Sequence, residues 1–86
     1  MTMSSMGGDA LSSVDREFVR RACDRSGGSL DVEVMGEEIG QELGLDERQT
    51  VEVVARLTRT GFLRDVGPRA RVKITIRSLV LAGHPE

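Results

Sequence analysis

The chain has 86 residues, which is enough for one small domain near the lower size limit for a core without disulfides or metals. Its two aromatic residues are Phe18 and Phe62, so valine, leucine and isoleucine must build the core. The single cysteine, Cys23, excludes an internal disulfide and a multi-cysteine metal cage. No apolar run approaches the roughly 20 residues that span a bilayer, and no leader pattern opens the sequence. We therefore expect a cytoplasmic protein without membrane contact.

The net charge of −2 is divided unevenly along the chain. Residues 1–47 hold eleven acids and four bases, a charge of −7, whereas residues 48–86 hold eight bases and three acids, a charge of +5. Such asymmetry suggests an anion-binding face on an otherwise acidic body. The alternative is that the arginines only solvate a small domain.

The first part of the chain predicts a tail followed by a helix. Residues 1–10 are small, polar and without periodicity, so we expect a disordered tail. Ser12 or Ser13 can cap the helix, with Asp15 in a capping-box position, and the helix should end at residues 26–28, Ser-Gly-Gly. One face recurs at helical spacing and should be buried: Val14, Phe18, Val19, Ala22 and Cys23.

A strand and a second helix are expected next. Residues 29–35 alternate, with Leu30, Val32 and Val34 on one side, which predicts a strand beside a later hairpin. Residues 36–43 predict a helix that buries Ile39 and Leu43. Gly40 lies inside this helix, which is tolerable if a neighbouring helix packs closely against it.

The third helix has the clearest start signal. Asp46 is a good N-cap, and Gln49 follows three residues later. The expected inward stripe consists of Thr50, Val53, Val54 and Leu57. The helix should end near residues 60–61, Thr-Gly.

A hairpin and a last helix complete the expected order. The strands are residues 62–66 and 69–76 around a Gly67-Pro68 turn, and one face of the second strand carries Val72, Ile74 and Ile76. Residues 77–82 predict a short helix, and residues 84–86 a tail with His84. The apolar run in this helix either packs on the first helix or forms a dimer contact: Leu79, Val80 and Leu81.

This order, with the segments ELGLDERQTVEVVARLTRTGFL and RVKITI, resembles the winged helix-turn-helix family of small bacterial DNA-binding domains. The resemblance implies an α+β fold over residues 11–83, with a three-helix core, a β-hairpin wing and a short C-terminal helix. It also implies binding of double-stranded DNA and control of transcription by a homodimer, for which the apolar run at residues 79–81 is the candidate contact.

In such a domain the third helix enters the major groove, and the wing contacts the backbone or the minor groove. Arg48 could pair with a guanine edge, Val51 or Ala55 could touch a thymine methyl, and Arg59 would reach phosphate. The candidate DNA-binding residues on the helix are Arg48, Gln49, Val51, Glu52, Ala55 and Arg59. Those on the wing are Arg64, Arg69, Arg71 and Lys73.

Other functions have less support from these residues. Catalysis lacks a nucleophile with a base, since the one histidine is terminal and the cysteine lies on a core stripe. No cofactor or metal motif is present, and no effector can be deduced. The runner-up is a winged-helix module that docks a protein, through Val51 and Ala55 or through the last helix. Glu52 also weakens the DNA hypothesis, because it can pair with Arg48 or Arg56.

Overall fold

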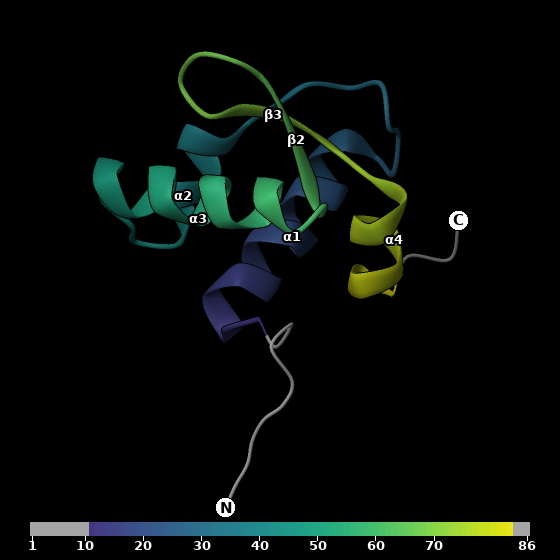
Figure 1. The fold of residues 1–86 in the computed structure, drawn as a ribbon, viewed down its shortest axis with the longest axis horizontal. Helices are drawn as coiled ribbons and strands as arrows, with labels where there is room; N and C mark the ends of the chain where they lie inside the picture. The colour runs from purple at the N-terminus through teal and green to yellow at the C-terminus, as the bar shows by residue number, and fades with distance from the viewer. Residues whose placement is uncertain (1–10, 84–86) are drawn as a thin grey trace, which may run out of the picture.

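A computed structural model describes residues 11–83 as an α+β arrangement of four helices and a three-stranded antiparallel sheet (Figure 1). The sheet order is β1-β3-β2, so the middle strand is the last in sequence. The elements are α1 (Ser13–Ser26), β1 (Val34–Met35), α2 (Gly36–Glu42), α3 (Glu47–Arg59), β2 (Leu63–Gly67), β3 (Arg71–Ile74) and α4 (Ile76–Ala82). The two predicted tails, residues 1–10 and 84–86, lie outside the described residues.

Helix α1 begins and ends where the sequence predicts. The hydroxyl of Ser12 accepts the Asp15 backbone N–H at 3.1 Å, and Gly27 ends the helix with a left-handed φ of 65°. The buried face, however, is rotated: Val14 is 39 % exposed, and Asp15 is buried in its place. The expectation that Val14 belongs to the core was wrong, because a charged partner on another helix draws Asp15 inward.

That partner is Arg56 of α3. Its Nε and Nη2 donate to the two carboxylate oxygens of Asp15, each at 2.8 Å, which is the two-pronged geometry that favours arginine. The hydrogen bond to Asp15 raises the pKa of Arg56. The predicted capping box is not complete, because the Asp15 side chain does not accept the Ser12 backbone N–H. Its carboxylate instead joins the first turn of α1 to α3.

Helices α2 and α3 approach each other at Gly40. A Cβ added there would lie 2.0 Å from Oγ1 of Thr50 and 2.9 Å from its Cγ2. The expectation that Gly40 permits close packing is therefore confirmed. The capping box of α3 is confirmed as well, because Asp46 accepts the Gln49 N–H at 2.8 Å and the Gln49 side chain accepts the Asp46 N–H at 3.0 Å.

The first predicted strand is much shorter than its alternating pattern indicates. Strand β1 contains only Val34 and Met35, and Leu30 and Val32 are 37 % and 42 % exposed. The hydroxyl of Ser29 accepts the Asp31 N–H at 3.2 Å, and this local bond favours a turn over an extended chain. The prediction of a strand from residue 29 was therefore wrong.

The hairpin strands are also shifted relative to the predicted bounds. Strand β3 ends at Ile74 because Thr75 caps α4: its hydroxyl accepts the Ser78 N–H at 3.2 Å. Ile76 is thus the first residue of α4 and is 68 % exposed, which corrects its predicted position on the buried face of the strand. Thr75 Oγ1 also donates to the Gly61 carbonyl at 2.8 Å, which joins this corner to the end of α3.

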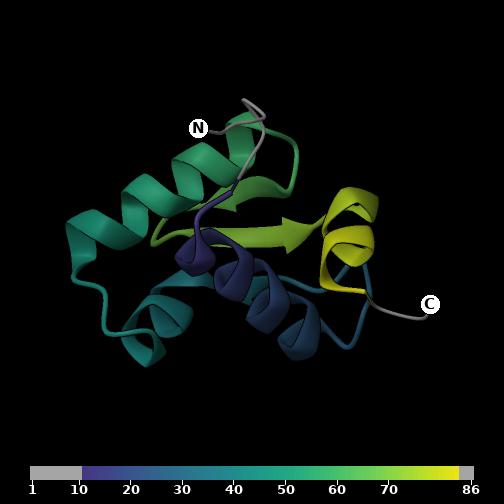
Figure 2. The same cartoon turned by 90° about the horizontal axis from the view of Figure 1, so that it is seen from below.

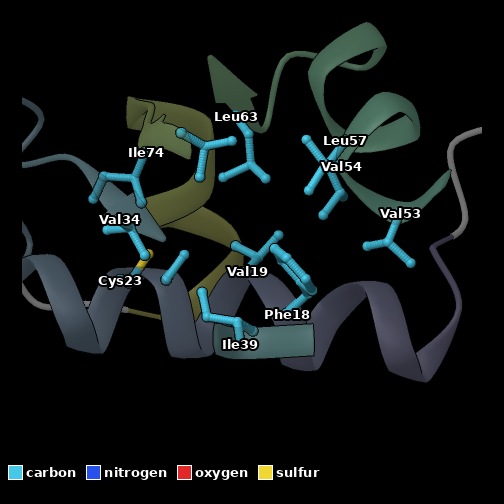
Figure 3. Packing of buried hydrophobic residues seen from close by; sticks show 12 residues of the cluster. Phe18, Val19, Cys23, Val34, Ile39, Val53, Val54, Leu57, Leu63 and Ile74 are labelled. Carbon is cyan, nitrogen blue, oxygen red and sulfur yellow. The ribbon is translucent and has the colours of Figure 1, made fainter. Parts of the chain in front are cut away.

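The core lies between α1, α3 and the inner face of the sheet (Figures 2 and 3). Its members come from every element except α4: Phe18, Val19, Ala22, Cys23, Val34, Ile39, Val53, Val54, Leu57, Leu63, Val72 and Ile74. Burial, aided by the charge of Asp24, raises the pKa of Cys23 to about 11, so its thiol stays protonated and inert near neutral pH. Leu79 and Leu81 of α4 are partly buried and pack against this core.

We expect Gly40→Ala to lower the free energy of unfolding by about 1–3 kcal/mol, measured by urea denaturation. The added methyl must push α2 and α3 apart, and the better helix propensity of alanine offsets only part of this effect. Gln41→Ala, at the exposed neighbouring position, is the control and should change stability by less than about 0.5 kcal/mol. Equal effects of the two substitutions would contradict the close packing.

Candidate nucleic-acid interface

The outer side of α3 carries the residues predicted to contact DNA. Arg48, Glu52, Ala55 and Arg59 are all exposed and share one stripe, since each step of three or four residues returns to the same side of a helix. Val51, 56 % exposed, lies beside this stripe on the side of the hairpin. Gln49 is the predicted helix residue whose side chain is already engaged, because its oxygen accepts the Asp46 N–H at the N-terminus of α3.

Most of the basic side chains predicted to contact DNA have no acidic partner among the described residues. Within residues 11–83, no ion pair involves Arg48, Arg59, Arg64, Arg69 or Lys73. The predicted pairing of Glu52 with Arg56 is not formed, because Arg56 binds Asp15, and Glu52 does not pair with Arg48 either. Five of the predicted cations are therefore available to a ligand.

The acidic first half of the chain is partly neutralised by its own arginines. Arg21 pairs with Glu17 at 3.2 Å and with Glu42 at 3.0 Å, and Arg25 pairs with Glu38 at 2.9 Å and also with Glu42. The hydrogen bond from Arg21 is the main cause that lowers the pKa of Glu42. The pairs with Glu38 and Glu42 join α1 to α2, away from the outer stripe of α3.

The strand cations lie on the outer face of the sheet. Arg64 and Lys73 are direct partners in the β2–β3 pairing, and neighbouring pairs alternate between the two faces. The adjacent pair, Leu63 with Ile74, is buried in the core, so Arg64 and Lys73 point the other way. Arg71 shares their face, and its Nη1 lies 3.6 Å from the Glu33 carboxylate. The structure therefore separates these three side chains from Arg48 and Arg59.

Arg69 occupies the hairpin turn and lines a hollow together with Thr50 and Val51 of α3. The apex is not Gly67-Pro68, as predicted, but Arg69-Ala70, both with positive φ, at 63° and 59°. The Pro68 carbonyl accepts the Arg71 N–H at 3.3 Å, which completes a type I′ turn. The Ala70 carbonyl accepts the Gly36 N–H at 2.9 Å, so the turn is fastened to the start of α2.

Two adjoining hollows lie between α3 and the hairpin. The larger, about 380 Å³, is lined by Val51, Val54, Ala55, Thr58, Arg59, Asp65, Gly67 and Ala70. The second, about 320 Å³, is lined by Glu37, Glu47, Thr50, Val51, Arg69 and Ala70. The Asp65 carboxylate accepts the Gly67 N–H at 3.2 Å, where the pairing of β2 is irregular. The hollows thus have apolar walls, two arginines and three carboxylates.

The remaining chemistry of the described residues is limited. No group of three or more His, Cys, Asp or Glu side chains between residues 11 and 83 could hold a metal ion. None of the helices in this range has the length and apolar character needed to cross a bilayer. His84 lies outside the described residues.

Comparisons with known proteins give no match to this chain among family models, curated proteins or solved structures.

The turn geometry predicts that Arg69→Asn raises the free energy of unfolding by about 0.5–1 kcal/mol, measured by chemical denaturation. Asparagine adopts positive φ more readily than arginine and is favoured at this position of a type I′ turn. Arg69→Ala is the control, because it removes the same charge and keeps the unfavourable backbone. If both variants change stability equally, the left-handed conformation of Arg69 is not the cause.

Proposed function

We propose that this chain is a winged helix-turn-helix domain that binds double-stranded DNA, with α3 in the major groove and the hairpin turn on the backbone, and that it regulates transcription. The observation that carries the proposal is a set of arginines on the exposed side of α3 and at the adjoining turn that form no ion pair within residues 11–83: Arg48, Arg59 and Arg69.

The element order supports the fold assignment. Helices α2 and α3 are joined by four residues, and their contact at Gly40 and Thr50 holds them as one unit. The outer stripe of α3 is left exposed by this packing, and the hairpin follows directly after α3. A helix that is held on one side and exposed on the other is what insertion into a groove requires.

The spacing of the helix arginines also fits a duplex. Arg48 lies in the first turn of α3 and Arg59 in the last, about 16 Å apart along the axis by the helical rise. The major groove is about 12 Å wide. Arg48 can therefore reach a base edge in the groove while Arg59 meets phosphate at its wall.

The turn supplies a third cation on a backbone that is held in place. Arg69 lines the hollow that also contains Val51 of α3, and the Ala70–Gly36 hydrogen bond holds the turn. A cation on a backbone that is already held loses less conformational freedom on binding than one on a mobile loop.

A second candidate function is the docking of a protein in the hollow between α3 and the hairpin. The observation in its favour is the exposed Val51 beside Val54, Ala55 and Ala70 in a largely apolar hollow. Asp65, with the nearby Glu37 and Glu47, would also repel phosphate. We rank it second because Arg48 and Arg59 lie on the outermost part of α3, where a duplex would arrive first.

A homodimer through Leu79, Val80 and Leu81 stays a prediction. Leu79 and Leu81 pack against the core, whereas Val80 is 75 % exposed and lies one helical turn from the exposed Ile76. These two side chains are the surface of α4 that a second copy would contact, and sedimentation velocity of the isolated protein tests this contact.

If Arg59 and Arg69 each neutralise a phosphate, while Arg48 reads a base edge only at the correct sequence, the affinity for random duplex should fall with salt at a log–log slope of about −1.8. Fluorescence anisotropy with a 20-base-pair duplex measures it. Arg69→Gln should reduce the slope by about 0.9, and Arg16→Gln, an exposed charge on α1, should leave it unchanged. Absence of binding at micromolar protein and low salt, with the fold intact by circular dichroism, would favour the protein-docking function.

Arg48→Ala should weaken binding to a selected site by about 1–3 kcal/mol and barely change binding to random duplex. The reason is that a pairing with a guanine edge exists only at the correct sequence. The measurement is a pair of anisotropy titrations, one on the best duplex from a randomised pool and one on a scrambled version. Equal losses on both duplexes would show that Arg48 contacts the backbone.

A further inference from the structure

The outer face of the sheet carries a close group of cations that α3 does not share. Arg64 and Lys73 are direct cross-strand partners, so their Cβ atoms are about 5 Å apart. Arg71 lies two residues before Lys73 on the same face of β3. In Figure 1 the hairpin forms the upper rim of the molecule, and α1, α3 and α4 lie below it. This outer face is therefore free of helices.

The arrangement is unfavourable for the isolated protein. Like charges directly opposite each other on paired strands repel, and within residues 11–83 neither Arg64 nor Lys73 has an ion-pair partner. Arg71 has only the long and exposed pair with Glu33, and pairs of that kind contribute little. A bound anion would remove the repulsion between Arg64 and Lys73. A need for charged side chains in contact with water does not explain why these two cations lie directly opposite each other.

The group cannot act together with the arginines of α3 on one rigid surface. Leu63, next to Arg64, points into the core near Leu57 of α3, and Asp65, on the other side of Arg64, lines the hollow against α3. Alternation along β2 turns Arg64 away from α3, and Lys73 turns with it. A duplex resting on Arg48 and Arg59 would leave Arg64 and Lys73 facing another direction.

From this geometry we propose that the outer face of the sheet, made by Arg64, Arg71 and Lys73, is a second site for the phosphate backbone, and that one protein molecule holds two duplex segments together. The inference rests on the proposed DNA binding by α3 and extends it from binding one duplex to bridging two. The phosphodiester chain is the favoured ligand because its regularly spaced charges can meet three cations on one flat face at once.

The test is capture of one duplex by another. A biotinylated 20-base-pair duplex is fixed on beads, and a fluorescent duplex of the same length and unrelated sequence is added with protein at low salt. We expect wild-type protein to retain the fluorescent duplex on the beads. The Arg64→Gln/Lys73→Gln variant should retain at least ten-fold less of it than wild-type protein does. The Arg48→Gln/Arg59→Gln variant removes the same number of charges from α3. It should also retain less of the fluorescent duplex, because bridging needs both faces.

Titration with a single duplex separates the two faces. For Arg64→Gln/Lys73→Gln we expect the salt slope of single-duplex binding to stay within about 0.5 of the wild-type value, because α3 makes that contact. A slope reduced by about 1.8 would overturn the inference, since both cations would then sit on the duplex that α3 binds. Retention by this variant at the wild-type level would overturn it too, and sedimentation velocity would show whether a dimer is the cause.

Failure of the proposed function would look different. If wild-type protein binds no random duplex at all, both proposals fall. If it binds one duplex but retains no second one, only the bridging falls. Thermal unfolding verifies that the Arg64→Gln/Lys73→Gln variant is folded. Removal of the like-charge pair should leave its melting temperature unchanged or raised.

Discussion

The structure depends on the absence of a side chain at Gly40. With a hydrogen there, α2 can lie directly on Thr50, and the four-residue connection between α2 and α3 can close. Thr50 is held in turn, because its hydroxyl donates to the Asp46 carbonyl at 2.9 Å. The direction of α3 follows from this contact, and so does the choice of which side of α3 faces solvent.

The ion pair between the buried Asp15 and the half-exposed Arg56 fixes α3 from its other side. Arg56 lies on the flank of α3 that faces α1, and its two hydrogen bonds at 2.8 Å each use the acid of α1 that solvent reaches least. Because of this pair, Arg56 does not add its charge to the arginines on the outer side of α3. Glu52 is left without an arginine partner among the described residues. The electrostatic character of the outer side of α3 is therefore decided by a contact beneath it.

The positive half of the chain forms two surfaces and not one. Residues 48–86 carry a net charge of +5, but the β2–β3 register turns Arg64 and Lys73 away from the helix arginines. The turn at Arg69-Ala70 lies between the two surfaces and is fixed by the bond from Gly36. The protein therefore has two separate cationic faces, with carboxylates in the hollow beside α3. A single basic patch would hold one polyanion, whereas two faces suggest the bridging of two.

Elements whose signals are local could be predicted from the residues alone. The α3 cap depends on Asp46 and Gln49, three residues apart, and the inward stripe of Thr50, Val53, Val54 and Leu57 depends on helical spacing alone. The need for a close neighbour at Gly40 could be deduced because glycine inside a helix is unfavourable without one. The α+β class and the order of helices and hairpin follow from the same local signals.

Features that depend on contacts between residues distant in the chain could not be predicted from local signals. Asp15 is buried and Val14 exposed because Arg56, 41 residues later, reaches α1. The strand predicted from residue 29 shrinks to two residues, since the Ser29–Asp31 turn outweighs its alternation, and the Thr75 cap moves Ile76 from a strand to a helix. Which arginines share a face depends on strand register and helix packing, and these are long-range properties that no spacing along the chain encodes.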